Sequence, residues 1–163
     1  MVNVENLRGG TGNDTLIGDH AGNHLEGVNG NDTLRGNAGD DTLTGGTGAD
    51  TMSGGAGNDE YVIRRSDGWD LILNQAEDAA GETDILRILD ADLHELRFAL
   101  SGNDLRISVA GSTAGATVRD WLASDSARLD AVLARDGAID AAAIDLQLGI
   151  VAPNLLMPDQ QPS

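Results

Sequence analysis

Two different patterns of hydrophobic and polar residues divide the chain. In the first part, one apolar residue recurs at every ninth position among glycines and polar residues, at Leu16, Leu25, Leu34, Leu43, Met52 and Tyr61. A single inward-facing side chain per block predicts one very short strand, formed by the three residues around the apolar position. The six residues between two such strands are predicted to form a turn.

After about residue 73 the chain contains less glycine and shows the alternation that is typical of longer strands. The predicted elements are strands over residues 84–89, 96–100, 105–109 and 116–118, a hairpin turn at 101–104, a helical turn at 91–95, a strand or helix at 128–134 and a helix at 138–148. The second part is therefore predicted to be a mainly β unit with a short helix.

The polar residues of the first part repeat with the same period. Six consecutive nine-residue blocks run from Gly9 to Val62, and each begins with glycine. The sixth position of the blocks is occupied by Asp14, Asn23, Asp32, Asp41, Asp50 and Asp59. Glycine permits the positive φ angles that turn backbone carbonyls to one side, and aspartate adds a carboxylate. An all-oxygen set favours Ca²⁺, because Mg²⁺ gives up its water reluctantly and zinc or copper prefers His or Cys.

The blocks resemble the nonapeptide repeats of the RTX, or haemolysin-type calcium-binding, family, and the resemblance covers roughly residues 1–75. It implies an all-β fold, a calcium-loaded parallel β-roll in which turns stack with every second block. One column of turns would contain Asp14, Asp32 and Asp50, and the other Asn23, Asp41 and Asp59. The ions, about four to six in all, would lie between stacked turns, because one turn cannot supply the oxygens that Ca²⁺ requires.

The resemblance implies that backbone carbonyls and carboxylates of the turns hold the ions. The expected ligand positions are Gly9, Thr11, Gly12, Asp14, Asn23, Gly27, Asn29, Gly30, Asp32, Gly36, Ala38, Gly39, Asp41, Gly45, Thr47, Gly48, Asp50, Gly54, Ala56, Gly57, Asp59 and Asp70. Asp70 belongs to a half-repeat displaced by two residues and is expected to close the first column. The gap between Asn23 and Asp41 is expected to be weaker, because Asn23 lacks a charge. Asp84 is interpreted as structural rather than ligating.

Other site chemistries find little support in the sequence. His20 and His24 are four residues apart, but they lie in a glycine turn and on a short strand, so they do not form a helical zinc pair. The serines have no histidine constellation or nucleophile elbow around them. Trp69 and Trp121 are predicted to pack in the core or the cap rather than to stack on sugars. No catalytic residue is predicted, and the chain is not expected to be an enzyme.

Composition limits the classes of partner that the chain can bind. The 163 residues include 27 acidic and 10 basic side chains, which gives a net charge of −17. Such a chain repels nucleic acids and acidic membrane surfaces, and it repels itself until a cation binds. There is no cysteine, no apolar run of membrane length and no N-terminal signal-peptide pattern.

Three segments are expected: an RTX β-roll at 1–73, a capping domain at 74–148 and a flexible tail at 149–163 that is possibly part of a secretion signal. The segment after the array resembles the domain that commonly follows RTX repeats. Such a domain covers the open end of the roll, since a solenoid without a cap exposes its last apolar residues and strand edges.

The predicted function is that of a calcium-binding module that folds on meeting Ca²⁺ after type I secretion and supports the folding of a larger bacterial exoprotein. The resemblance implies a secreted, extracellular protein without an N-terminal signal peptide, exported unfolded by the type I secretion machinery, and a monomer is expected. Two alternatives stay open. One is an adhesin-type module that binds a glycan or a cell-surface protein, and the other is a non-catalytic fragment of a secreted enzyme or toxin.

Overall fold

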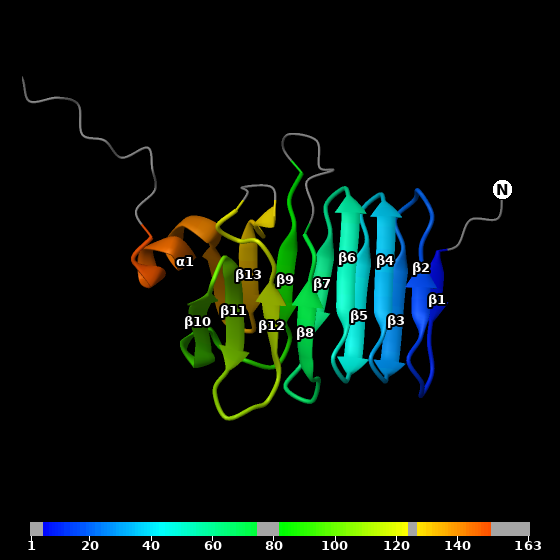
Figure 1. Cartoon of the computed structure of the whole chain (residues 1–163), viewed down its shortest axis with the longest axis horizontal. Helices are drawn as coiled ribbons and strands as arrows, with labels where there is room; N and C mark the ends of the chain where they lie inside the picture. The colour runs from blue at the N-terminus through cyan, green and yellow to red at the C-terminus, as the bar shows by residue number, and fades with distance from the viewer. Residues whose placement is uncertain (1–4, 75–81, 124–126, 151–163) are drawn as a thin grey trace, which may run out of the picture.

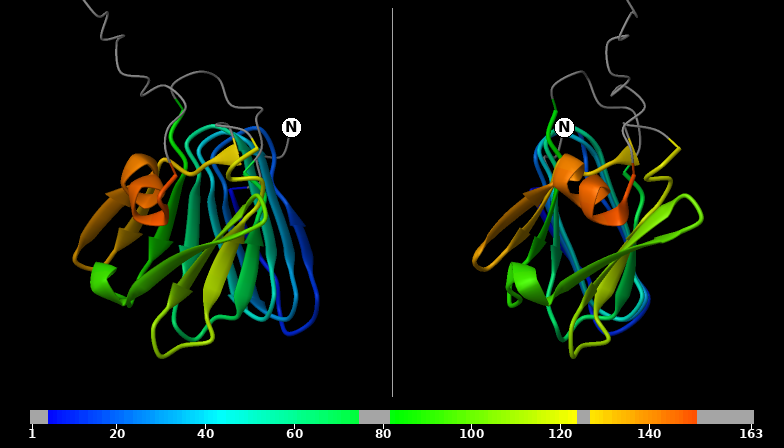
Figure 2. Two further views of the ribbon diagram at one scale, coloured as in Figure 1. Left: turned by 60° about the vertical axis from the view of Figure 1, so that its left-hand side comes forward. Right: turned by 90° about the vertical axis from the view of Figure 1, so that its left-hand side faces the viewer.

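The computed structural model describes residues 5–74, 82–123 and 127–150. Two seven-stranded sheets lie face to face along the length of the molecule (Figures 1 and 2). Sheet A has the order β1 (Asn6–Arg8), β3 (His24–Asn29), β5 (Thr42–Thr47), β7 (Glu60–Ile63), β9 (Ile85–Ile88), β13 (Ala131–Ala134) and β14 (Gly137–Asp140). Sheet B has the order β10 (Leu96–Ser101), β11 (Asp104–Val109), β12 (Gly115–Val118), β8 (Trp69–Ile72), β6 (Thr51–Ala56), β4 (Thr33–Ala38) and β2 (Thr15–Ile17).

Consecutive strands of the repeat region alternate between the two sheets, and every second strand pairs in parallel. Leu34 of β4 is paired with Leu16 of β2 on one side and with Met52 of β6 on the other. The apolar residues of the blocks therefore lie in register, and from Leu25 onward their side chains are fully buried between the sheets. The chain is the all-β parallel β-roll that the nine-residue period predicts.

The first two strands of the roll, β1 and β2, have the three residues predicted, but the later strands are longer. Those from β3 to β6 have six residues each, so the connecting turns comprise only three residues, such as 30–32. The prediction of six-residue turns was wrong because residues beyond the block's first glycine still pair with the next turn, as Val28 does with Gly46.

The C-terminal part extends both sheets of the roll. Thr51 pairs with Leu71, 20 residues on, whereas Thr33 pairs with Thr51, 18 residues on, so β8 absorbs the two-residue displacement seen in the sequence. In sheet A, β9 and β13 continue the parallel pairing and β14 closes it with an antiparallel hairpin. In sheet B, β12 is parallel to β8, and β11 and β10 follow antiparallel.

Most elements predicted for this part are present. The hairpin turn at 101–104 joins β10 and β11, and the helical turn is the 3₁₀ helix η1 (Leu93–Glu95). Of the residues 128–134 predicted as strand or helix, the last four form the strand β13. The predicted helix starts later than expected, as α1 (Ala141–Leu148), because residues 137–140 pair with β13. Trp121 is fully buried in the core. Each sheet contains strands from both sides of residue 73, paired without a gap between them. The proposed tail lies almost wholly outside the described residues.

Candidate calcium sites

The sixth-position residues stack in two columns, one at each edge of the roll. In the first column the backbone N–H of Asp14 donates to Oδ1 of Asp32 at 2.8 Å, and Asp32 N–H donates to Oδ1 of Asp50 at 2.7 Å. Asp50 N–H donates to Oδ1 of Asp70 at 3.1 Å, so Asp70 closes this column as expected. One carboxylate oxygen of each successive aspartate thus holds the preceding turn.

The second column follows the same rule and extends further than predicted. Asn23 N–H donates to Oδ1 of Asp41 at 2.7 Å, and Asp41 N–H donates to Oδ1 of Asp59 at 2.9 Å. Asp59 N–H then donates to Oδ1 of Asp84 at 2.9 Å, and Asp84 N–H to Asp130 at 2.8 Å. Asp84 therefore occupies a column position.

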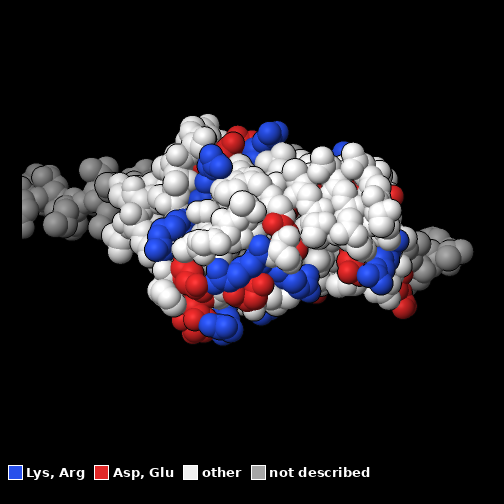
Figure 3. Space-filling view, turned by 90° about the horizontal axis from the view of Figure 1, so that it is seen from below, with Lys and Arg blue, Asp and Glu red and all other residues white. Residues whose placement is uncertain are grey.

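The other oxygen of the column carboxylates is buried. Oδ2 of Asp32, Asp41, Asp50 and Asp70 is shielded from solvent and has no hydrogen-bond partner among the residues that the structure describes. Seen from below, the surface over the stacked turns of the first column is mostly uncharged, because these carboxylates lie beneath backbone and small side chains (Figure 3). A buried ionised oxygen without a partner is costly, so these atoms favour a cation beside them.

A glycine opens a space next to Oδ2 of Asp32, of Asp41 and of Asp50. A Cβ added to Gly27 would lie 2.3 Å from Oδ2 of Asp32 and 2.5 Å from the carbonyl oxygen of Gly45. At Gly36 the corresponding distances to Asp41 Oδ2 and the Gly54 carbonyl are 2.0 and 2.6 Å. A carboxylate from one turn and a carbonyl from the stacked turn therefore converge on a point that any side chain would fill.

The fourth-position glycines allow the turns to stack closely. Gly48 has a φ of +135°, and a Cβ there would lie only 1.8 Å from the carbonyl oxygen of Gly30. Both the left-handed backbone and the close approach therefore require glycine. The result is a set of carbonyl and carboxylate oxygens without nitrogen or sulfur ligands, which fits Ca²⁺.

Burial raises the pKa of carboxylates in both columns. Desolvation raises the pKa of Asp41 and of Asp50 to about 6, although backbone N–H groups of Asn23 and Asp32 oppose the shift. The pKa of Asp70 rises to about 8, again chiefly through burial, with repulsion from Asp50 and Asp67 adding to it. Without a cation, some of these carboxylates would carry protons near neutral pH, as carboxylates that lack a counter-charge do.

Two positions of the array escaped the sequence reasoning. Asp84, which the sequence indicates to be structural rather than ligating, accepts from Asp59 the same backbone-to-carboxylate hydrogen bond that links the repeats, and whether it binds an ion stays a prediction. Glu5 takes the sixth position one block before Gly9, since its carbonyl accepts from His24 N–H at 2.9 Å, as that of Asp14 accepts from Thr33. The signal was present in Leu7, nine residues before Leu16.

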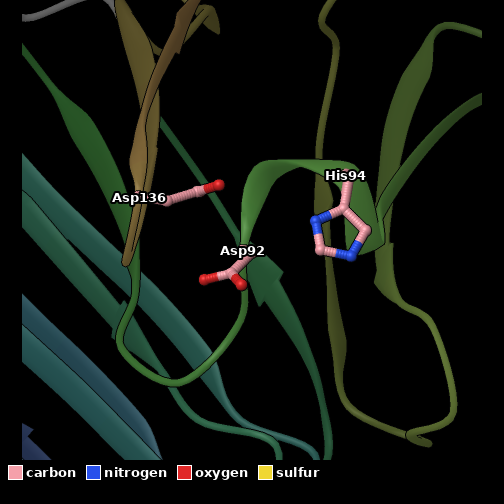
Figure 4. A group of neighbouring side chains, drawn as sticks. All are labelled: Asp92, His94 and Asp136. Atoms are coloured by element: carbon pink, nitrogen blue, oxygen red, sulfur yellow. The ribbon is translucent and has the colours of Figure 1, made fainter.

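A third group of possible metal ligands lies in the C-terminal part. Asp92, His94 and Asp136 bring ligand atoms within 4.8 Å of one another near η1 (Figure 4). The Asp92 carboxylate is already held by Arg135 through Nε and an Nη at 2.7 and 2.6 Å, and Asp136 accepts from Leu93 N–H at 2.7 Å. In this surface cluster the Asp92 carboxylate is therefore already ion-paired, and one oxygen of Asp136 is held by a backbone N–H.

Comparison with known proteins agrees with this geometry. Residues 4–24 and 26–61 match the RTX calcium-binding nonapeptide repeat in four copies. The structure is similar to the solution structure of the AlgE6R3 subunit of the mannuronan C5-epimerase of Azotobacter vinelandii, with a TM-score of 0.54 and 22% identity over 95% of this chain and 92% of that chain. A comparison of the sequence with curated proteins found no match.

The first part of the chain is therefore an array of RTX repeats, which bind Ca²⁺, and the molecule is a calcium-binding β-roll module. The prediction of RTX repeats is confirmed. No helix in the described residues is long and apolar enough to cross a membrane. The individual ligand positions and the number of ions stay predictions.

Proposed function

We propose that the chain is a folding module that stays open at low calcium and forms the β-roll when Ca²⁺ binds between its stacked turns. The observation that carries this proposal is the row of buried Oδ2 atoms of Asp32, Asp41, Asp50 and Asp70, which no described hydrogen-bond donor satisfies. Each block buries one apolar side chain, which stabilises the fold less than ordering nine residues destabilises it. The bound cation supplies the difference and removes the carboxylate repulsion.

The ligands proposed are the carboxylates of the two columns together with carbonyls of the turns. Their positions are those that the sequence predicts, from Gly9 to Asp70, with Asp84 added because it stacks on Asp59. About four to six ions would be held, one between each pair of stacked turns that supplies enough oxygens. The pair of Asn23 and Asp41 is the weakest, since Asn23 contributes no charge.

The physiological setting we propose follows from this behaviour. An acidic chain that is unfolded in a calcium-poor cytosol can pass through type I secretion machinery, and millimolar external calcium then folds it. The parent would be a larger secreted bacterial protein, and the segment at 74–148 would serve as the cap of the roll. That cap role is supported by two of its strands, because β9 pairs with β7 and β12 pairs with β8.

A calcium titration tests the proposal. Circular dichroism of the purified chain should show less strand after chelation, with the loss in the roll, and a cooperative gain of strand on addition of Ca²⁺, whereas Mg²⁺ at the same concentration should fail to restore it. Equal strand content with and without chelator would contradict the proposal.

A single substitution sharpens the test. Asp41→Asn keeps the Oδ1 acceptor for Asn23 N–H but removes the charge at the buried Oδ2, so the calcium midpoint should rise about tenfold, equivalent to about 1.4 kcal/mol. The matched control is Asp120→Asn, at an exposed residue outside the columns whose φ of +59° asparagine tolerates. A control that shifts as much as Asp41→Asn would refute the site assignment.

A further inference from the structure

The eighth position of the last block differs in chemistry from the same position of the other blocks. The five earlier blocks have leucine or methionine there, whereas the sixth has Tyr61, which carries a hydroxyl group. The Tyr61 side chain is fully buried between the sheets, and a phenol hydroxyl in such a place requires hydrogen-bond partners. The hydroxyl accepts from Gly54 N–H at 2.9 Å and donates to Oδ1 of Asn74 at 3.0 Å. The tyrosine therefore makes two polar contacts that leucine could not make.

The contact with Gly54 replaces a backbone hydrogen bond of the roll. A glycine that begins an earlier block donates to the paired strand, as Gly18 N–H does to the carbonyl of Arg35 in β4 at 2.8 Å. The register of β6 with β8 ends at Met52, so Gly54 lies beyond the last pair of that ladder. The Tyr61 hydroxyl thus accepts from Gly54 at the point where the period of the repeats breaks.

Gly54 also belongs to a candidate calcium site. Its carbonyl oxygen and Oδ2 of Asp41 converge on the space beside Gly36, in the gap between the stacked turns of Asp41 and Asp59. Oδ2 of Asp41 is buried and has no hydrogen-bond partner within the described part of the chain. Because the N–H and the carbonyl belong to one residue, the hydrogen bond from Gly54 to Tyr61 limits how far this carbonyl can move from the gap.

The contact with Asn74 leads into the C-terminal part. Asn74 is buried, and its Nδ2 donates to the backbone carbonyl of Arg128 at 3.1 Å. The Arg128 guanidinium forms an ion pair with Asp145 of α1 and lies 4.7 Å from the ring centroid of Trp121. The Trp121 indole N–H donates to the same Asp145 carboxylate at 3.1 Å. Hydrogen bonds therefore connect Tyr61, through Asn74, to the residue that holds α1.

We propose that Tyr61 is a positioning residue for calcium, which holds the Gly54 carbonyl at the Asp41 gap and couples the filling of this gap to the cap through Asn74. The inference rests on the calcium-dependent folding proposed above. Such coupling is reciprocal: an ion that fixes Gly54 strengthens the contact of Asn74 with Arg128, and that contact strengthens the binding of the ion. A hydroxyl that accepts and donates at once suits this role, since hydrogen bonds in a chain strengthen one another.

Single and double substitutions in the full chain test the positioning role, with the calcium midpoint followed by circular dichroism. Tyr61→Phe keeps the ring but leaves the buried Gly54 N–H without this acceptor, so the midpoint should rise about tenfold. In an Asp41→Asn background the same change should add at most about threefold, because both substitutions act on one gap. In an Asp32→Asn background, which alters the other column, Tyr61→Phe should keep its full effect. An equal effect in both backgrounds, or no effect, would overturn the proposal.

The NMR signal of the Trp121 indole N–H measures the coupling to the cap. In the unchanged chain this signal should shift as the gap at Asp41 fills, and in Tyr61→Phe and Asn74→Ala it should no longer follow calcium. Asn74→Ala leaves the Tyr61 hydroxyl in place, so it provides the test even if Tyr61→Phe does not fold. Ile72→Val is the packing control, since it removes a methyl group from a fully buried residue of β8 and no hydrogen bond. The coupling is refuted if the signal of the unchanged chain ignores calcium, if that of Asn74→Ala still follows it, or if Ile72→Val loses the response as well.

Failure of this inference is distinguishable from failure of the folding proposal. If Asp41→Asn leaves the calcium midpoint unchanged, the assignment of the calcium gap is wrong whatever Tyr61 does. If Asp41→Asn raises the midpoint but Tyr61→Phe acts equally in both backgrounds, only the role of Tyr61 is wrong.

Discussion

The roll and the C-terminal part share two continuous sheets but hold their charges in opposite ways. In the roll, Asp32, Asp41 and Asp50 are almost wholly buried, and no arginine forms an ion pair with them among the described residues. In the C-terminal part, acids pair with arginines, as in Arg128–Asp145 and Arg135–Asp92. In the function proposed above, the first region relies on an external cation, whereas the second carries its own cations.

The hydrophobic cores of the two regions also differ, since the core of the roll is the smaller one. Each strand of the roll contributes about one apolar side chain, while the C-terminal part buries a continuous set that includes Leu105, Ile107, Val118, Trp121 and Val132. A packed core supports a region without metal, and a single row of leucines between glycine turns does not. We therefore expect one fold with a half whose folding depends on calcium and a half that packs by ordinary hydrophobic burial.

Chelation should separate the two regions most strongly. After calcium is removed, the amide protons of Asp32 and Asp41, which donate to column carboxylates, should lose their protection from hydrogen exchange. Amides of the β10–β11 hairpin, such as the one at Ile107, should keep measurable protection. Exchange measured by NMR at single residues decides this, and uniform loss or uniform retention would show that the two regions fold as one unit.

The next largest effect concerns the one position of the second column that lacks a charge. Asn23→Asp restores a carboxylate opposite Asp41, so Ca²⁺ affinity at this gap should increase about tenfold. Calorimetric titration should then resolve one more tight ion, and in chelator the variant should be less stable because of the added repulsion. An unchanged titration would show that no ion lies between Asn23 and Asp41.

The sequence predicted the roll well because its signals are local and periodic. Glycine at fixed positions, aspartate at the sixth and leucine at the eighth determine the turn, the ligand oxygens and the core together. The extension of the column to Asp84 could not be predicted in the same way, since Asp59 and Asp84 are 25 residues apart and the segment between them breaks the period. The position of strand β12 beside β8 could not be predicted either, because the paired residues Trp69 and Gly115 are 46 residues apart and no periodicity relates them.

Lowering the pH should stabilise the fold of the chelated protein and destabilise that of the calcium-loaded protein. Burial raises the pKa of Asp41 and Asp50 to about 6 and that of Asp70 to about 8, from an ordinary value of 3.8. A raised pKa favours the folded state while the group is protonated, so this contribution is complete below pH about 4 and is lost as the pH rises through 6 to 8. In chelator, the fraction of folded roll should therefore be larger at pH 5 than at pH 8.

With saturating calcium the dependence should reverse, because the ion requires ionised carboxylates. Thermal melts at several pH values, with chelator and with calcium, measure both slopes. The interpretation fails if the chelated and the loaded protein respond to pH with the same sign.

The smallest expected effect concerns backbone strain at the second residue of a nine-residue block. Val28 has a φ of +86°, where a β-branched residue is strained, and its paired residue in the next turn is Gly46. Val28→Gly should raise the stability of the loaded roll by about 1 kcal/mol, the relief of strain exceeding the added freedom of the unfolded chain. Asn37, with a φ of +83°, provides the matched position, and Asn37→Gly should gain less because asparagine tolerates this conformation. Denaturant unfolding in calcium measures both, and an equal gain would mean that side-chain strain does not distinguish the two turns.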